Sequence, residues 1–116
     1  MIPGLANPSP QLKGDTWAGW SSVNISPCPV GKVLASVKIE WKDSRGCVAM
    51  TRSTADGSVT ITDDGSASTE WEYSVDGGLI TIAAGDYTFD HQTTDADGAV
   101  RTYWRGTHTI QQDITD

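Results

Sequence analysis

The sequence predicts an all-β fold, an antiparallel β-sandwich of seven to nine strands with an extended N-terminal arm. Short segments alternate between apolar and polar residues, and no apolar stripe follows the 3.6-residue period of a helix. Turn signals of the Asp-Gly type separate these segments at intervals of about ten residues. Twelve of the 15 acidic residues are Asp, which favours turns over helices.

Composition limits the function classes. The chain has 116 residues, nine of them aromatic, which suits one small domain with a core. Its net charge of −7 and its eight scattered Lys and Arg residues argue against nucleic-acid binding. No apolar run is long enough to cross a membrane, and the first residues lack the basic start of a signal peptide. We therefore expect no membrane insertion and no classical secretion.

The chain is expected to divide into an arm, residues 1–12, and a single sandwich domain, residues 13–116. The arm contains Pro3, Pro8 and Pro10 and shows no periodic pattern, which is typical of an extended segment. Such a segment buries too little surface to order by itself, so we expect it to lie on a neighbouring subunit.

Clear alternation begins at Lys32. One face of the strand predicted there is apolar and the other polar, with Leu34 as an exception; the apolar residues are Val33, Ala35, Val37, Ile39 and Trp41, and the polar ones are Ser36, Lys38, Glu40 and Lys42. Turn residues 43–46 follow. Residues 47–51 then form an apolar run that is predicted to pair back as a hairpin.

The middle of the chain predicts shorter strands. Residues 57–62 read as a strand between two Asx-Gly turns. Residues 71–75 and 79–82 are expected to form a hairpin around Asp76-Gly77-Gly78. Residues 65–70 are either irregular or a short helical turn capped by Ser68 or Thr69.

The last third is the most regular part. Residues 87–92 predict a strand, Asp95-Ala96-Asp97-Gly98 a turn, and residues 100–106 a returning strand that continues through 107–111. Within the returning strand, Tyr103 and Trp104 are expected on opposite faces, and Arg101, Tyr103 and Arg105 on one face. That face either pairs with an acidic neighbour or is a solvated edge.

No pattern in the sequence predicts a catalytic or metal site. Asp95 and Asp97 match the head of a calcium loop, but the twelfth position, which needs an acid, is Gly106. Asp63-Asp64-Gly65 reads as a solvated turn. Asp90 and His91 are neighbours on a strand, so their side chains are expected on opposite faces. We therefore predict no enzymatic activity, no cofactor and no metal.

Two residue types leave alternatives open. The five tryptophans either all pack in the core and its edges or leave some at contacts with partners; they are Trp17, Trp20, Trp41, Trp71 and Trp104. Cys28 and Cys47 are favoured as two reduced, buried thiols over a disulfide, because disulfides rarely persist in proteins made in the cytosol. No Cys or His cluster accompanies them, which argues against a structural zinc site.

Several segments resemble a known pattern. Gly14-Asp15-Thr16-Trp17 and, further on, residues 57–63, 83–90 and 94–102 are similar in order and spacing to small phage β-sandwich proteins. The same segments resemble the N-terminal domains of phage upper-baseplate and tail-fibre proteins. The likeness spans roughly residues 14–116 and departs at His91, where relatives have an apolar residue, and in the aromatic-rich stretch 71–75.

The resemblance implies an immunoglobulin-like sandwich that is a non-enzymatic structural protein of a virion, made in the host cytoplasm. Its role would be an adaptor in the tail, the baseplate or the fibre attachment point; the alternatives are a capsid decoration, cement or neck protein, and an adhesion module that binds carbohydrate. The expected partners are other virion proteins and further copies of the chain. The candidate interface residues are Pro3, Pro8, Pro10, Trp17, Trp20, Arg101, Tyr103 and Arg105.

Overall fold

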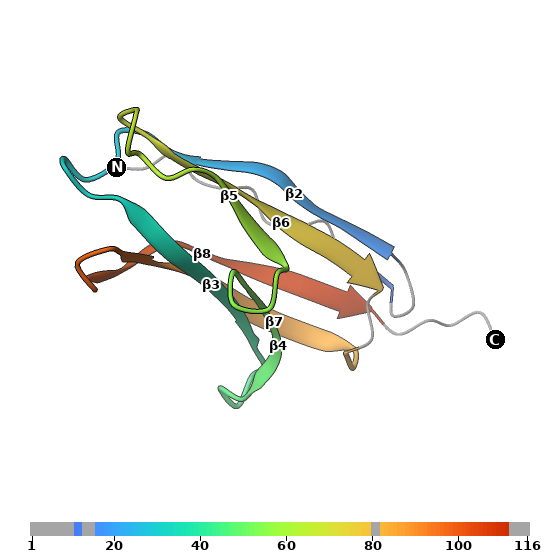
Figure 1. Ribbon diagram of the computed structural model, residues 1–116. Helices are drawn as coiled ribbons and strands as arrows, with labels where there is room; N and C mark the ends of the chain where they lie inside the picture. Colours follow the sequence, from blue (N-terminus) through green and yellow to red (C-terminus); the bar gives the residue numbers. More distant parts are fainter. Residues whose placement is uncertain (1–10, 13–15, 80–81, 112–116) are drawn as a thin grey trace.

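The protein is an antiparallel β-sandwich, as predicted (Figure 1). The computed structural model describes residues 11–12, 16–79 and 82–111. Within these residues the chain forms eight strands: β1 (Gln11–Leu12), β2 (Thr16–Ile25), β3 (Leu34–Lys42), β4 (Val48–Ser53), β5 (Val59–Asp63), β6 (Trp71–Leu79), β7 (Gly85–Asp95) and β8 (Val100–Gln111). None of the described residues belongs to a helix long and apolar enough to span a membrane.

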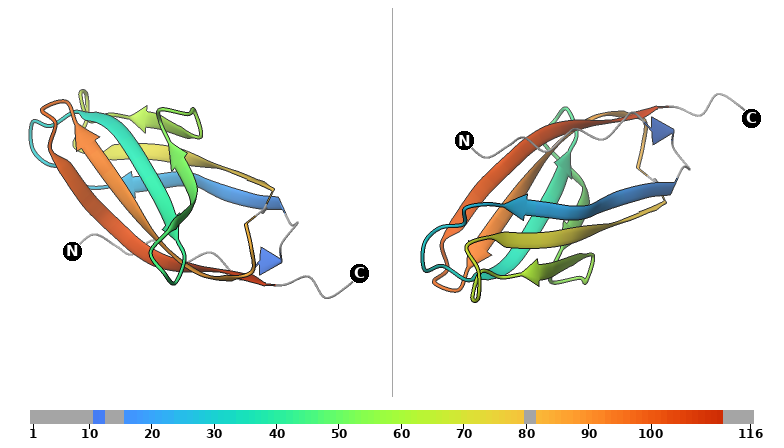
Figure 2. Two further views of the ribbon diagram at one scale, coloured as in Figure 1. Left: turned by 90° about the horizontal axis from the view of Figure 1, so that it is seen from below. Right: turned by 90° about the horizontal axis from the view of Figure 1, so that it is seen from above.

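The strands form two sheets that pack face to face (Figure 2). The larger sheet has the order β1-β8-β7-β3-β4 and the smaller has the order β2-β6-β5. All neighbours are antiparallel except β1, which runs parallel to β8 and pairs Gln11 with Ile110. The end of the predicted arm therefore belongs to the chain's own sheet. The rest of the arm, with Pro3, Pro8 and Pro10, lies outside the described residues.

Strand β2 was not predicted, because its sequence does not alternate regularly. Gly19 has a φ of +76°, and the pairing with β6 shifts register between Trp20 and Val23. This bulge lets Trp20, which packs against the core, face the same side as the buried Val23 and Ile25 although three positions separate Trp20 from Val23.

The predicted strand at 32–42 is confirmed as β3, but the faces of its first residues were predicted wrongly. Leu34 is buried and Ala35 is exposed, the reverse of the expected faces. A register shift against β7 between Leu34 and Ser36 causes the exchange, since one extra residue reverses the alternation. The turn at 43–46 and the hairpin to β4 are confirmed.

The predicted hairpin around Asp76-Gly77-Gly78 is wrong: β6 continues through these residues to Leu79. Its extended path is held by β2 on one side, where Gly19 pairs with Asp76 and Trp17 with Gly78. Arg52 of β4 supports the other side, with Nε donating to the Asp76 carbonyl at 3.1 Å and Nη2 to the Gly77 carbonyl at 3.4 Å.

Residues 65–69 are bends, so the helical-turn alternative for this segment is also wrong. Leu34 N–H donates to the Asp64 carbonyl and Cys28 N–H to the Thr69 carbonyl, each at 2.9 Å. These bonds satisfy backbone groups at both ends of the segment from outside it, and no helical bonding is needed there.

The core lies between the sheets and is rich in aromatic rings. The buried apolar side chains are Trp17, Val23, Ile25, Cys28, Leu34, Val37, Ile39, Trp41, Val59, Trp71, Tyr73, Val75, Tyr87, Phe89, Trp104 and Ile110. Trp20 is partly buried and lies against Trp41 with ring centroids 6.1 Å apart. All five tryptophans therefore pack in the core or at its edge, which resolves the alternative left by the sequence.

Candidate functional site

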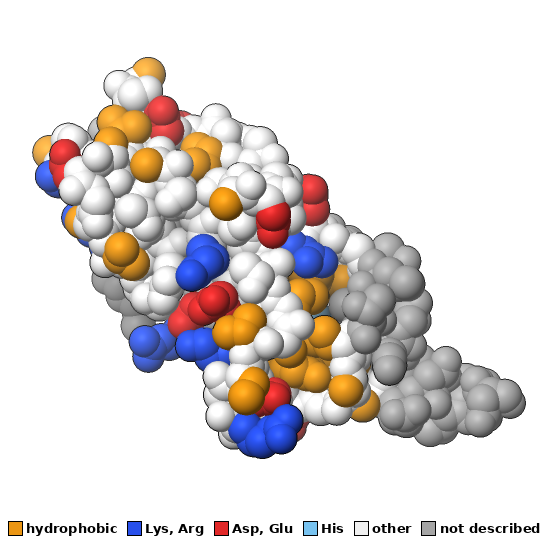
Figure 3. Space-filling model, turned by 60° about the horizontal axis from the view of Figure 1, so that its bottom comes forward, with side chains coloured by type: hydrophobic (Ala, Val, Ile, Leu, Met, Phe, Trp, Pro, Cys, Tyr) orange, Lys and Arg blue, Asp and Glu red, His pale blue; other side chains and the backbone are white. Residues whose placement is uncertain are grey.

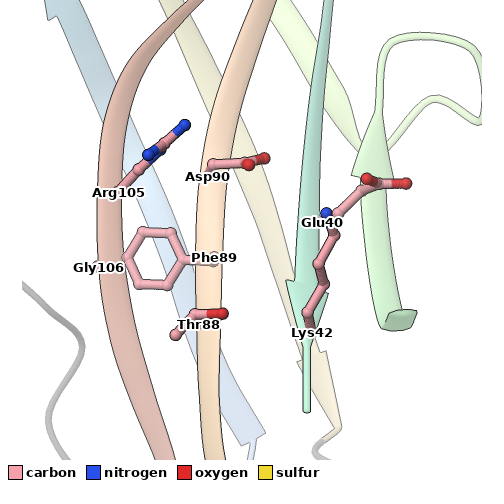
Figure 4. Close-up of a pocket in the computed structure, with 7 residues that line it drawn as sticks. All are labelled: Glu40, Lys42, Thr88, Phe89, Asp90, Arg105 and Gly106. Atoms are coloured by element: carbon pink, nitrogen blue, oxygen red, sulfur yellow. The ribbon is translucent and has the colours of Figure 1, made fainter. Parts of the chain in front are cut away.

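The outer face of the larger sheet carries a row of charged side chains across its central strands. Register places Glu40 of β3 opposite Asp90 of β7, and Asp90 opposite Arg105 of β8. Together with Lys42 and Thr88, these residues line a shallow hollow of about 400 Å³ (Figure 4). Figure 3, with the lower layer of Figure 1 brought forward, shows acidic side chains lying among basic ones. This outer face is the candidate functional site.

Asp90 and Glu40 place two carboxylates directly opposite each other in this row, which is an unfavourable cross-strand pair. Oδ1 of Asp90 is buried and has no hydrogen-bond partner among the residues that the structure describes. Glu40 is partly compensated by Lys38, whose Nζ lies 3.7 Å from its Oε2. The row therefore contains a carboxylate oxygen that accepts no hydrogen bond from the described part of the chain.

Two basic side chains of this face also lack an ion-pair partner among the described residues. Neither Lys42 nor Arg105 forms an ion pair within the described ranges. The sequence had assigned Lys38, Glu40 and Lys42 to the outer face of β3, and the structure confirms that assignment. The register that aligns them with Asp90 and Arg105 was not predicted.

The candidate interface residues near the N-terminal end of the domain lie inside the sandwich. Trp17 is only 5% exposed and packs against Trp20, Trp41 and His108, with ring centroids 5.0, 5.6 and 5.4 Å away. Trp20 is partly buried against the same cluster. Trp17 is therefore not exposed to a partner, which corrects its assignment as a candidate interface residue.

Arg101, Tyr103 and Arg105 do not share a face, because β8 has a register shift where Tyr103 is the extra residue. Tyr103 is partly buried and turns inward toward Trp71, with ring centroids 6.1 Å apart, and the adjacent Trp104 is buried. The expectation that Tyr103 and Trp104 face opposite sides is thus also wrong. Of this group, only Arg105 lies exposed on the outer face.

Arg101 instead holds the β7–β8 turn. Its Nη1 lies 2.6 Å from Oδ2 of Asp95, whose side chain is buried. Oδ1 of Asp95 accepts the N–H groups of Asp97 and Ala99. These bonds, above all the one from Arg101, lower the pKa of Asp95. Asp97 pairs with Lys32 at 2.7 Å, so the turn predicted at 95–98 is confirmed and its two carboxylates are held by basic side chains.

Asp90 and His91 point to opposite faces, as predicted. His91 lies in the core with no exposed surface, and Nδ1 is 2.7 Å from the Tyr73 hydroxyl. His108 is also fully buried, and its Nδ1 accepts a bond of 3.3 Å from Nε1 of Trp41. Burial lowers the pKa of both imidazoles, that of His91 to about 3. Both rings are therefore neutral at pH 7.

The two cysteines differ in exposure, which corrects the expectation that both are buried. Cys28 is buried and Cys47 is exposed, and both are free thiols in the structure. In the described part of the chain, no group of three or more His, Cys, Asp or Glu side chains is placed to hold a metal ion.

No family model matches the chain, and no curated protein matches it. Among solved structures, CopC from Methylosinus trichosporium OB3b is similar with a TM-score of 0.38 and 15% sequence identity, over 83% of this chain and 81% of that one. This likeness is too low to bear on function.

Proposed function

We propose that the protein is a non-enzymatic structural protein of a phage virion, an adaptor in the tail or baseplate or at the fibre attachment point. The proposal joins the sequence resemblance to one structural observation. The outer face of the larger sheet presents charged groups that the described chain leaves unpaired, namely Lys42, Arg105 and Asp90. A partner with complementary charges would form ion pairs with these groups and would thereby favour association.

A carbohydrate-binding role receives less support. That function would use exposed tryptophans as platforms for sugar rings. Four of the five tryptophans are buried, and Trp20 is partly buried against the core. A capsid decoration, cement or neck protein is the second candidate, since it would use the same sandwich and the same charged face.

Particle stoichiometry separates the candidates. Quantitative mass spectrometry of purified particles is expected to find the chain in three or six copies, or a small multiple, for a tail or baseplate adaptor. Hundreds of copies would instead identify a decoration protein. Absence from purified particles, with the chain present in the infected cell, would refute a virion role altogether.

A further inference from the structure

One side of the larger sheet ends in a short parallel pairing. β1 contains two residues, and it pairs Gln11 with Ile110 and Leu12 with Gln111. Its neighbour β8 is much longer, with 12 residues. In the sheet order β1-β8-β7-β3-β4, the described part of β1 therefore lies against the C-terminal end of β8.

The residues before β1 match the rest of β8 in direction, register and length. In both described pairs the residue of β8 is numbered 99 higher than its partner, so the same register would set residues 1–10 opposite residues 100–109. Met1 would then lie opposite Val100, the first residue of β8. Ten extended residues span about 33 Å, the same length as ten residues of β8. Because β1 runs parallel to β8, the chain before Gln11 needs no turn to follow this path.

The composition of residues 1–10 suits the outermost strand of a sheet. None of the ten side chains is charged. Pro8 and Pro10 are two residues apart, so in an extended segment both ring nitrogens face the same side. Proline is tolerated in an edge strand when its nitrogen faces away from the neighbouring strand. Strand alternation then points the N–H groups of Asn7 and Ser9 toward β8.

An irregular point of β8 would fall opposite a glycine. β8 shifts register against β7 at Tyr103, which has no partner in the sequence of pairs between the two strands. The register of β1 places Gly4 opposite Tyr103. Glycine within a strand often marks a bulge, so the segment could follow β8 through this irregularity.

We propose that residues 1–10 continue β1 as a parallel strand along β8 of the same chain, in the register that β1 establishes. Leu5 would lie opposite Trp104, and its side chain would point toward the core as that of Trp104 does. The sequence predicts that this segment lies on a neighbouring subunit. The pairing of β1 with β8 within one chain favours the chain's own sheet instead.

A strand in this position would cover one edge of the larger sheet. Exposed strand edges pair readily with other chains, and natural proteins block them with prolines or a covering segment. Pro8 and Pro10 would leave the outer side of the added strand short of N–H donors. This edge would then be closed to strand addition by a partner, which would have to dock on the outer faces or the loops.

Paired cysteines test the register directly. Ala6 would lie opposite Arg105, and partner Cα atoms of neighbouring strands lie about 4.8 Å apart, within the range of roughly 4.4–6.8 Å that a disulfide bridges. A Cys47→Ser background removes the exposed native thiol. In that background, Ala6→Cys/Arg105→Cys is expected to form a disulfide within one chain under mild oxidation. Peptide mapping by mass spectrometry without reduction identifies the link.

A mismatched pair provides the control. Ala6→Cys/Thr109→Cys moves the second thiol four residues along β8, which is about 13 Å, and little disulfide is expected. Comparable yields in the matched and mismatched pairs, or no disulfide in the matched pair, would overturn the register. A disulfide between two chains, recovered as a covalent dimer, would also overturn the proposal and assign the segment to a neighbouring copy.

Proline substitutions test the hydrogen bonds. Asn7→Pro removes an N–H group that would donate to β8, whereas Ala6→Pro removes one that would face away from it, and Asn7→Ala controls for the lost side chain. Exchange of the β8 backbone amides with deuterium is expected to accelerate several-fold in Asn7→Pro. Ala6→Pro and Asn7→Ala are expected to exchange like the wild type.

Equal exchange in Asn7→Pro and Ala6→Pro would show that the segment makes no such hydrogen bonds and would refute the proposal. The inference goes beyond the proposed function and does not depend on it. Particle stoichiometry tests the virion role, whereas the disulfide and exchange measurements use the isolated 116-residue chain.

Discussion

The phenol oxygen of Tyr73 and Nδ1 of His91 lie 2.7 Å apart, in a hydrogen bond that joins β6 of the smaller sheet to β7 of the larger. Both side chains are fully buried, and the His91 ring also packs on Trp20 and Trp104, with centroids 4.9 and 5.6 Å away. A polar contact thus links the two layers within an aromatic core. The same burial makes the imidazole costly to protonate.

Acid is expected to destabilise the fold well before its carboxylates titrate. The unfolded His91 takes up a proton near pH 6.5, whereas the folded residue has a pKa of about 3. Stability is therefore highest above pH 6.5 and falls as the pH drops toward 3. At pH 4.5, two units below 6.5, the loss from His91 is about 2.7 kcal/mol. Urea denaturation at pH 7 and pH 4.5 measures it.

His91→Gln provides the control for this pH dependence, because glutamine does not titrate. The variant is expected to be less stable at pH 7 and to lose a large part of the difference between pH 7 and pH 4.5. Carboxylates with pKa values lowered below 3.8 titrate beneath this window; they are Asp43, Asp56, Asp64 and Asp95. An equal pH dependence in wild type and variant would show that His91 is not responsible.

Gly19→Ala is expected to destabilise the sandwich more than an alanine at Gly57. Both glycines have positive φ, +76° and +83°, so both substitutions carry backbone strain of roughly 1–2 kcal/mol. At Gly19 the added Cβ would also lie 2.2 Å from the Val75 carbonyl oxygen, whereas at Gly57 no atom lies within 4 Å. Comparing the melting temperatures of the two variants separates the effect of this steric contact from that of backbone strain. Equal decreases in melting temperature would show that the contact has no effect.

Arg101 and Arg105 are expected to respond differently to the same substitution. Arg101→Met leaves the buried Asp95 carboxylate without its cation and is expected to lower the melting temperature by several degrees. Arg105→Met removes an exposed guanidinium without an ion pair in the described part of the chain and is expected to leave it unchanged. Differential scanning calorimetry measures both melting temperatures. A larger decrease for Arg105→Met than for Arg101→Met would contradict the structural role of Arg101.

The two thiols are expected to react at very different rates. Cys47 is exposed and Cys28 is buried, so an aromatic disulfide reagent should modify one thiol per chain in the native state and two in denaturant. Cys47→Ser removes the fast phase. No fast phase in the native wild type, with two thiols after reduction, would instead indicate that the cysteines pair.

Sequence patterning predicted the strands wherever alternation is regular, as in β3, β5 and the β7–β8 hairpin. It failed where one inserted residue changes the face of every residue that follows. Leu34, Tyr103 and the Trp20–Val23 segment all lie at such register shifts, and no local sequence signal marks them.

The prediction at the glycines of β6 is wrong for a related reason. Asp76-Gly77-Gly78 has the composition of a tight turn, yet β2 on one side and Arg52 on the other keep it extended. Contacts with β2 and Arg52 thus outweighed the preference of these residues for a turn. The outer face of β3 was predictable from alternation, but the row that joins Glu40, Asp90 and Arg105 depends on strand order, which the sequence does not reveal.

The aromatic core also provides an internal optical probe. Indoles enclosed by apolar neighbours emit at shorter wavelengths than hydrated ones, and this chain encloses tryptophans from both layers, among them Trp17 of β2 and Trp41 of β3. Any event that parts the layers admits water to both at once. The emission maximum therefore reports separation of the two sheets without an attached dye, whether acid, heat or denaturant is the cause.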